Sequence, residues 1–135
     1  MKIVIDLPPV SKERPHFGKG HAYTPENTRV YEEAVKLIAS TKVKQPLSGA
    51  LKMTLIFYMP IPKSWSEKRK EQALRGEIRP TTRPDIDNLE KAICDGLNGV
   101  AYIDDRLIVE KHTYEYYGKP RTEIWLQKIA LTSND

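Results

Sequence analysis

The chain has 135 residues, of which 39% are hydrophobic and 30% charged, with a formal net charge of +4 at pH 7. This length and composition are typical of one globular domain with its own core, and they exclude a disordered chain. No apolar run approaches the length that a membrane span needs, and the single cysteine cannot form an intramolecular disulfide. We therefore expect one domain over residues 1–135, a cytoplasmic location without a membrane partner, and a basic surface that favours an anionic partner.

The first third of the chain is predicted to form a strand, an arm and a helix. Residues 2–7 (KIVIDL) are apolar and β-branched, which is typical of a strand. Residues 8–29 hold four prolines and predict a long, irregular arm. A helix is predicted over residues 27–41, after the start signal Thr24-Pro25-Glu26. The apolar residues at helical spacing in it are Val30, Ala34, Leu37 and Ile38.

The middle of the chain is predicted to contain one strand and two helices. Residues 49–60 predict an apolar strand that ends at a proline, and residues 64–77 predict a short, charged helix that ends at a glycine. After a linker (RPTTRP), Asp85 or Asp87 is expected to cap a helix that runs to about Gly96–Gly99. The inward residues of this helix are expected to be Leu89, Ala92, Ile93 and Leu97.

The last part of the chain predicts two long strands, over residues 101–119 and 122–131, joined near Gly118 as a plausible hairpin. The tail TSND is expected to be frayed. The order of elements is then β-α-β-α-α-β-β. We therefore predict an α/β (α+β) fold, a single small domain in which one mixed β-sheet packs against helices.

Negative charge is concentrated in residues 85–105, which hold six acids and one base. This segment carries −5, so the remaining 114 residues carry +9. Asp85 and Asp87 stand two apart at a helix entrance, where alternate residues of a still extended chain point the same way. Asp104 and Asp105 begin the next predicted strand, which returns them to the mouth of the helix if the two elements pack side by side.

Carboxylates held near one point repel one another, and a bound cation offsets that repulsion. Oxygen ligands without cysteine or histidine suit Mg²⁺ or Mn²⁺ rather than zinc. An EF-hand is excluded, because Leu89 would occupy a ligand position, Glu90 the glycine position and Gly96 the final glutamate position. Since Mg²⁺ completes its shell with water and phosphate oxygens, a basic protein with such a site is suited to bring metal and phosphate together.

Each part of this acidic pattern also has an ordinary structural interpretation. An aspartate at a helix N-terminus is most often a cap. Asp87 and Lys91, four residues apart, are most often a surface ion pair worth about 0.3–0.5 kcal/mol. The Asp104-Asp105 pair could be a solvated turn. The co-occurrence of all three in a chain that is basic elsewhere favours the metal site.

Basic residues precede the acidic segment, with seven bases and three glutamates in residues 63–83. Lys and Arg neutralise phosphates and release counterions, so binding to nucleic acid is expected to weaken steeply with salt. The residues expected to contact DNA are Lys12, Arg14, Lys19, Arg29, Arg83 and Asn88. Phe17, Tyr23 and Trp65 are candidates for stacking on exposed bases. The alternatives are a solvated helix face at SEKRKEQ and a core position for Trp65.

The segment RPDIDNLEKAICDGLNG…YIDD resembles the RusA family of Holliday-junction resolvases, which is common in phages and prophages. The opening PPVSKERPHF…AYTPENTRVYEEAV is similar to that family too, so the resemblance covers most of the chain. It implies a small α/β homodimer that cuts four-way DNA junctions with Mg²⁺ or Mn²⁺. The family's catalytic carboxylates fall on Asp85, Asp87 and Asp105, its essential lysine on Lys91 and its motif asparagine on Asn88.

Two departures from the family pattern bear on the site. The turn before Asp104 is one residue shorter than in the best-known member, so the choice between Asp104 and Asp105 as metal ligand stays open. Pro84 stands where some members have arginine.

From these observations we predict a metal-dependent endodeoxyribonuclease that resolves four-way junctions by paired symmetric cuts in DNA recombination or repair. The aspartates are expected to hold one or two ions, and Lys91 to stabilise charge or position the water. The two-fold symmetry of a junction fits a homodimer, with residues 112–118 (HTYEYYG) and Trp125 as candidate interface. The alternatives are a non-catalytic DNA-binding or architectural module, and a nuclease for other branched DNA.

Overall fold

A four-stranded mixed sheet organises the molecule. The computed structural model describes residues 1–13, 16–18, 20–23 and 25–130. The strand order is β1 (Lys2–Ile5), β6 (Arg121–Lys128), β4 (Leu51–Met59) and β5 (Ile108–Tyr117). Strand β6 is antiparallel to both of its neighbours, whereas β4 and β5 are parallel. The predicted fold class, a mixed sheet with packed helices, is confirmed.

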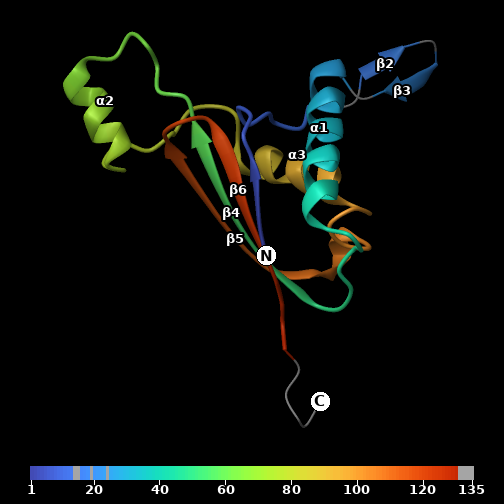
Figure 1. The fold of residues 1–135 in the computed structure, drawn as a ribbon. Coiled ribbons are helices and arrows are strands. Elements are labelled where there is room, and N and C mark those ends of the chain that lie inside the picture. The colour runs from blue at the N-terminus through green and yellow to red at the C-terminus, as the bar shows by residue number, and fades with distance from the viewer. Residues whose placement is uncertain (14–15, 19, 24, 131–135) are drawn as a thin grey trace.

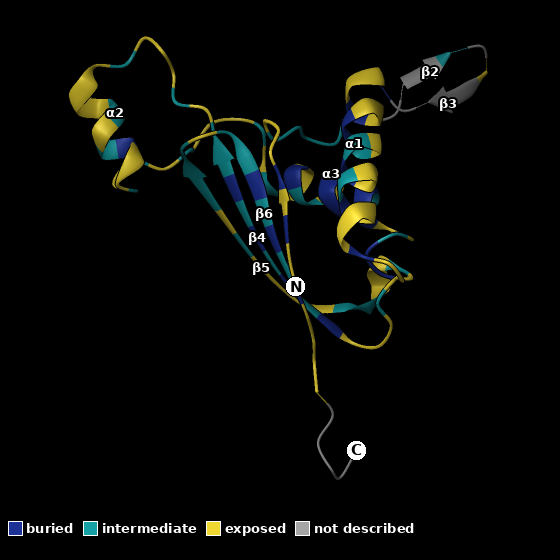
Figure 2. Ribbon diagram, viewed as in Figure 1, coloured by how far each residue is buried: buried dark blue, intermediate teal, exposed yellow. Residues whose placement is uncertain are grey.

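Two helices cover one face of this sheet, α1 (Glu26–Lys42) and α3 (Ile86–Leu97), whereas α2 (Glu67–Leu74) lies on the other side (Figure 1). Figure 2 shows that the buried residues gather between the sheet and the pair α1 and α3. Alternate residues of β4, from Leu51 to Phe57, point into this layer and are at most 1% exposed. The predicted inward residues of α3 are all fully buried, as are Ile124 in β6 and its partner in β1, Ile3.

Helices α1 and α3 approach most closely at Gly96. A Cβ atom on Gly96 would lie 2.8 Å from Cγ1 of Val35, so a larger residue would push the two helices apart. This contact turns Val35 and Tyr31 toward the core, and leaves Val30 and Leu37 52% and 70% exposed. The apolar face predicted for this helix is therefore wrong by about one residue, although the helix itself is confirmed.

The predicted hairpin near Gly118 is wrong, because β4 lies between β5 and β6. The three-residue link crosses the carboxyl end of β4, and the Gly118 N–H donates to the carbonyl of Met59 at 3.0 Å. A Cβ atom on Gly118 would lie 3.0 Å from Cδ1 of Tyr58. Since neighbouring strands are about 4.8 Å apart, three extended residues at about 3.3 Å each can span two strand positions as well as one.

Two other segments also differ from the prediction. Strand β5 begins at Ile108, and the residues before it form a 3₁₀ helix, η1 (Asp105–Leu107). In the arm, β2 (His16–Gly18) and β3 (His21–Tyr23) form an antiparallel hairpin where an irregular chain was predicted. The tail TSND and two predicted DNA contacts, Arg14 and Lys19, lie outside the described residues. Among the residues that are described, no helix is long and apolar enough to cross a membrane.

Candidate active site

Asp85 is the N-cap residue of helix α3, and its backbone carbonyl accepts the N–H of Leu89 at 3.2 Å. Its side chain makes no capping hydrogen bond. An aspartate that only caps a helix accepts a backbone N–H from the first turn. The exposed carboxylate of Asp85 therefore does not cap the helix, although capping is the usual role of an aspartate at this position.

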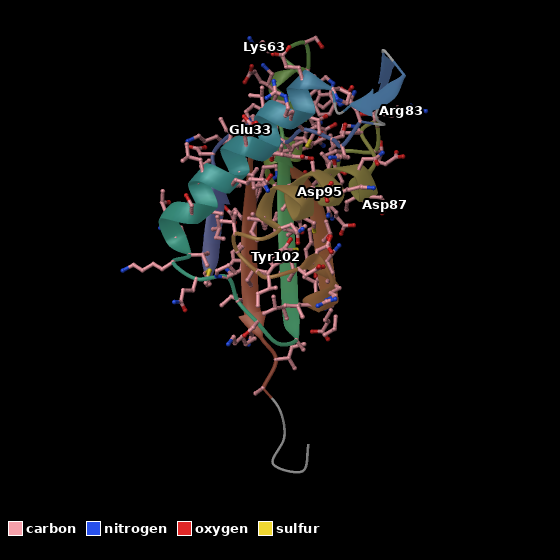
Figure 3. All side chains as sticks on the ribbon, turned by 90° about the vertical axis from the view of Figure 1, so that its right-hand side faces the viewer. Glu33, Lys63, Arg83, Asp87, Asp95 and Tyr102 are labelled. Carbon is pink, nitrogen blue, oxygen red and sulfur yellow. The ribbon has the colours of Figure 1, made fainter. Side chains whose placement is uncertain are left out.

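A cavity of about 230 Å³ lies between α3 and the start of β5. It is lined by Asp87, Glu90, Lys91, Cys94, Asp95, Asp105, Ile108 and Lys111. The structure thus brings together three residues that the sequence singles out: Asp87, Lys91 and Asp105. In Figure 3, Asp87 and Asp95 lie along α3, with Arg83 toward the Asp87 end. We call this space the acidic cavity.

Asp85 lies in a second cavity, of about 170 Å³, at the N-terminal end of α3. Its other lining residues are Ser11, Arg83, Pro84 and Asn88. Two of the predicted DNA contacts, Arg83 and Asn88, therefore stand beside Asp85. Asp85 therefore lines the neighbouring cavity at the same end of α3, and a common site with Asp87 and Asp105 stays a prediction.

Asp104 and Asp105 have different surroundings. The Asp104 carboxylate accepts the backbone N–H of Arg106 at 3.0 Å and so caps η1, which lowers the pKa of Asp104. Burial raises the pKa of Asp105, and the nearby carboxylates of Asp104 and Asp95 raise it further. Asp105 lines the acidic cavity and Asp104 does not. The geometry therefore favours Asp105 in the choice that the sequence leaves open.

Two of the four acids in the acidic cavity have partners. Oδ2 of Asp95 is 3.2 Å from the Lys12 ammonium, and Glu90 accepts a hydrogen bond from the Thr113 hydroxyl of β5. Within the described residues, neither Asp87 nor Asp105 forms an ion pair, and so the surface pair expected between Asp87 and Lys91 does not form. The unpaired acids of this cavity are thus two of the three that the sequence predicts as metal ligands.

The donor atoms of the acidic cavity suit Mg²⁺ or Mn²⁺ in kind. Asp87 and Asp105 offer carboxylate oxygens, whereas burial raises the pKa of the Cys94 thiol and disfavours a thiolate ligand. No three histidine, cysteine or acidic side chains among the described residues are grouped to hold an ion. Mg²⁺ keeps several waters and needs only one or two carboxylates with phosphate oxygens. The residues therefore fit a hydrated ion shared with a phosphate, not a closed cage.

Three charged residues of the acidic cavity, Glu90, Asp95 and Lys111, are not among the predicted site residues. Asp95 carries a usable signal, because it stands four residues after Lys91 and so shares its helix face. Lys111 carries none. It reaches the cavity only because β5 pairs in parallel with β4, with Lys111 opposite Met53.

The described residues among the predicted DNA contacts of the arm are already paired. The Lys12 ammonium is 2.6 Å from Glu32 as well as 3.2 Å from Asp95, and its side chain is only 16% exposed. Arg29 is 53% exposed and lies 3.3 Å from Glu33. A role for Lys12 and Arg29 in binding DNA stays a prediction.

A second charged region lies where β4 and β5 end and β6 begins. We call it the arginine–aromatic surface, formed by Tyr58, Trp65, Arg69, Arg79, Tyr116, Tyr117 and Arg121. The guanidinium groups of Arg69, Arg79 and Arg121 stack 3.7–4.0 Å from the ring centroids of Trp65, Tyr116 and Tyr58 respectively. The other contact of the Trp65 ring is edge-on with Tyr117, at 5.2 Å. Arg69 thus covers one face of the Trp65 ring, and the stacking of Trp65 on a base stays a prediction.

Comparison with known proteins gives two matches. The family model described as Endodeoxyribonuclease RusA matches residues 6–127. The chain is also 33% identical over 138 residues to "Uncharacterized protein YqaN" of Bacillus subtilis (strain 168), which covers 96% of this chain and 97% of that protein. The family match spans both cavities and every described residue that lines them.

Proposed function

Because this chain belongs to the RusA family of endodeoxyribonucleases, we propose that it is a metal-dependent enzyme that resolves four-way DNA junctions by paired symmetric cuts. The observation that supports this most is the acidic cavity, where Asp87, Lys91 and Asp105 line one space. Unpaired carboxylates beside a lysine, in a basic protein, can bind a cation and a phosphate together. DNA recombination and repair are the processes that such cuts would serve, and a cytoplasmic location stays a prediction.

Asp87 and Asp105 would hold the divalent ion, Mg²⁺ or Mn²⁺, with Asp85 contributing from the second cavity. Such an ion, when bound, supplies a water of lowered pKa and neutralises charge on the phosphate. Lys91 would stabilise the charge that develops on the phosphate oxygens or position the attacking water. Lys111, which lines the same cavity from β5, is a second cation for that charge.

DNA would be held mainly by its phosphates. Arg83 and Asn88 stand beside Asp85 and are placed to contact the backbone of the strand that is cut. The arginine–aromatic surface offers further guanidinium groups, oriented by stacking on rings. Contacts of this kind fix the position of the DNA without reading its sequence, as selection by the shape of the DNA requires.

A homodimer is proposed because a junction has two-fold symmetry and needs two cuts. Helices α1 and α3 cover one face of the sheet, and α2 is the helix that lies on the other side. Trp125 points to this second face, since its neighbours Ile124 and Leu126 are buried on the first. Val4 and Tyr114, on the same face, are 37% and 44% exposed. Apolar surface of this kind supports the predicted interface at residues 112–118 and Trp125.

The test is incubation with a synthetic four-way junction, a flap and a linear duplex, with and without Mg²⁺ or Mn²⁺. We expect cuts in the junction, symmetric across its centre, that require the metal. A plasmid that extrudes a cruciform should become linear, because paired cuts within one complex separate both strands.

Other outcomes would favour the other hypotheses. Nicked circles alone would contradict paired resolution but leave a metal-dependent nuclease. A preference for flaps would favour a nuclease for other branched DNA. Tight junction binding without cleavage in either metal would favour an architectural module, which the uncommitted side chain of Asp85 already disfavours.

A further inference from the structure

The ammonium of Lys12 joins three parts of the molecule. It belongs to the segment between β1 and β2, and it lies 2.6 Å from Oε2 of Glu32 on α1 and 3.2 Å from Oδ2 of Asp95 on α3. Its side chain and that of Glu32 are each only 16% exposed. An exposed ion pair holds its partners weakly, whereas a shielded ammonium that bonds two carboxylates is much harder to displace.

The backbone around Lys12 is held at the same place. Its N–H donates to the carbonyl of Asn88 in the first turn of α3 at 2.8 Å. The preceding residue, Ser11, accepts a bond from the Thr28 hydroxyl at 3.5 Å and lines the cavity of Asp85. The dipeptide Ser11-Lys12 therefore forms a wall of one cavity and supports an acid of the other.

Asp95 is the acid that this arrangement controls. It lines the acidic cavity with Asp87 and Asp105, and yet no three acids among the described residues form a metal-binding group. The ion pair with Lys12 binds the Asp95 carboxylate to the same ammonium that contacts Glu32 on α1. Burial lowers the pKa of Lys12, but the bonds to Glu32 and Asp95 outweigh this and raise it, so the ammonium stays charged.

We propose that Lys12 is a positioning residue that holds Asp95 in the wall of the acidic cavity, not a contact to DNA phosphate. The proposal rests on the function proposed above. Without the ammonium, Asp95 is an unpaired carboxylate beside Asp87 and Asp105, where it repels phosphate and competes for the cation. Glu32 does not line the cavity and, at 16% exposure, is left as a largely shielded carboxylate without this partner.

The test separates cleavage from binding in the variant Lys12→Met, which keeps the length of the side chain and removes the charge. Affinity for a four-way junction is measured in EDTA across a series of salt concentrations. The cleavage rate is measured with Mg²⁺ in single turnovers at saturating protein. We expect the rate to fall at least tenfold, while the metal-free affinity changes less than about threefold and its salt dependence stays unchanged.

A phosphate contact predicts the reverse. The affinity would fall, the slope of log affinity against log salt would decrease by about 1, and the saturated rate would hold. That result, or a variant that matches wild type in both measurements, would overturn the proposal. Lys44→Met, at an exposed lysine without an ion pair among the described residues, is the matched control. If wild type cuts no DNA, the proposed function fails, which is a different result from any of these.

A second variant tests the path through Asp95 and guards against misfolding, which a thermal melt would reveal. Asp95→Asn removes the charge that Lys12 restrains. Adding it to Lys12→Met should restore cleavage, and the double variant should cut within about threefold of Asp95→Asn alone, because the effects of coupled residues are not additive. A double variant that folds but cuts tenfold more slowly than Asp95→Asn would contradict the proposal.

Discussion

The acidic cavity and the arginine–aromatic surface organise charge in opposite ways. In the cavity, Asp87 and Asp105 stand on a helix and a 3₁₀ turn and have no ion-pair partner among the described residues. On the arginine–aromatic surface, the guanidinium groups of Arg69, Arg79 and Arg121 are each stacked on a ring. The first region holds charges of both signs, each with its own surroundings, whereas the second holds three charges of one kind in similar surroundings.

This difference predicts how substitutions in each region should affect cleavage and DNA binding. A carboxylate at a unique position has no neighbour that can replace it, so its substitution should abolish most of the cleavage activity. A stacked arginine among others contributes one phosphate contact of several, so its loss should be graded. The predictions below test this contrast in order of expected effect.

The largest effect is expected from Asp87→Asn and Asp105→Asn. Each should lower the cleavage rate by on the order of 10²–10³, the loss typical of one essential charge-stabilising group, while junction binding persists or tightens. Asp85→Asn should behave in the same way. Binding survives because each substitution removes a negative charge beside the phosphates. Gel-based single-turnover cleavage and metal-free affinity are the two measurements.

Asp104→Asn is the matched control for Asp105→Asn. Asparagine caps a helix as well as aspartate does, so η1 should persist and the rate should stay near wild type. Equal losses in both variants would contradict the assignment of Asp105, and a loss confined to Asp104→Asn would reverse it.

The next effect is expected from the two lysines of the acidic cavity. Lys91→Ala should lower the saturated cleavage rate by on the order of 10², and Lys111→Ala by about tenfold, because each cation faces the same phosphate. The melting temperature should be unchanged, since within the described residues neither lysine forms an ion pair. A folded Lys91→Ala variant with full activity would show that Lys91 is an ordinary surface residue of the helix without a role in cleavage.

The arginine–aromatic surface should give a graded response. Junction affinity should fall by on the order of 10³ between 50 and 200 mM salt if six or more phosphates are neutralised. Arg69→Ala or Arg79→Ala should weaken binding only a few-fold, reduce the salt slope by about 1 and leave the saturated rate intact. If junction affinity did not depend on salt, binding through phosphate charges would be refuted. If Arg69→Ala lowered the saturated cleavage rate, the two regions would not differ in the way proposed.

The smallest effect is expected from Glu115, an acid close to Arg79 of the arginine–aromatic surface. Its Oε2 is buried without a hydrogen bond among the described residues, and burial raises its pKa although Arg79 opposes the shift. The folded protein thus binds this proton more tightly than the unfolded chain does, so ionisation of Glu115 destabilises the fold as pH rises. Glu115→Gln should raise the melting temperature by a few degrees at most at neutral pH.

The advantage of Glu115→Gln should disappear below the ordinary pKa of glutamic acid, about 4.3, where both proteins carry a neutral side chain. Paired melting curves from pH 3 to pH 8 would show this. A wild type that gains stability over the variant as pH rises would show that the carboxylate of Glu115 is favourably paired.

The sequence by itself determines the elements that depend on short-range order. Helix α3 is predicted with Asp85 or Asp87 at its N-terminus and its buried face from Leu89 to Leu97, because a helix relates residues three and four apart. Strand β4 follows in the same way from alternation. The motif from Asp85 to Asp105 is contiguous, and so the family could be recognised before any fold was known.

Only the tertiary structure decides how distant segments meet. It turns Asp105 into the acidic cavity, commits Asp104 to a cap, and pairs Lys12 with Asp95. It also inserts β4 between β5 and β6, although a three-residue link permits a hairpin equally well. The physical reason is the same in each case. Local preferences act across a few residues, whereas the direction of a side chain at a site depends on which segments the sheet and the close packing of α1 on α3 bring together.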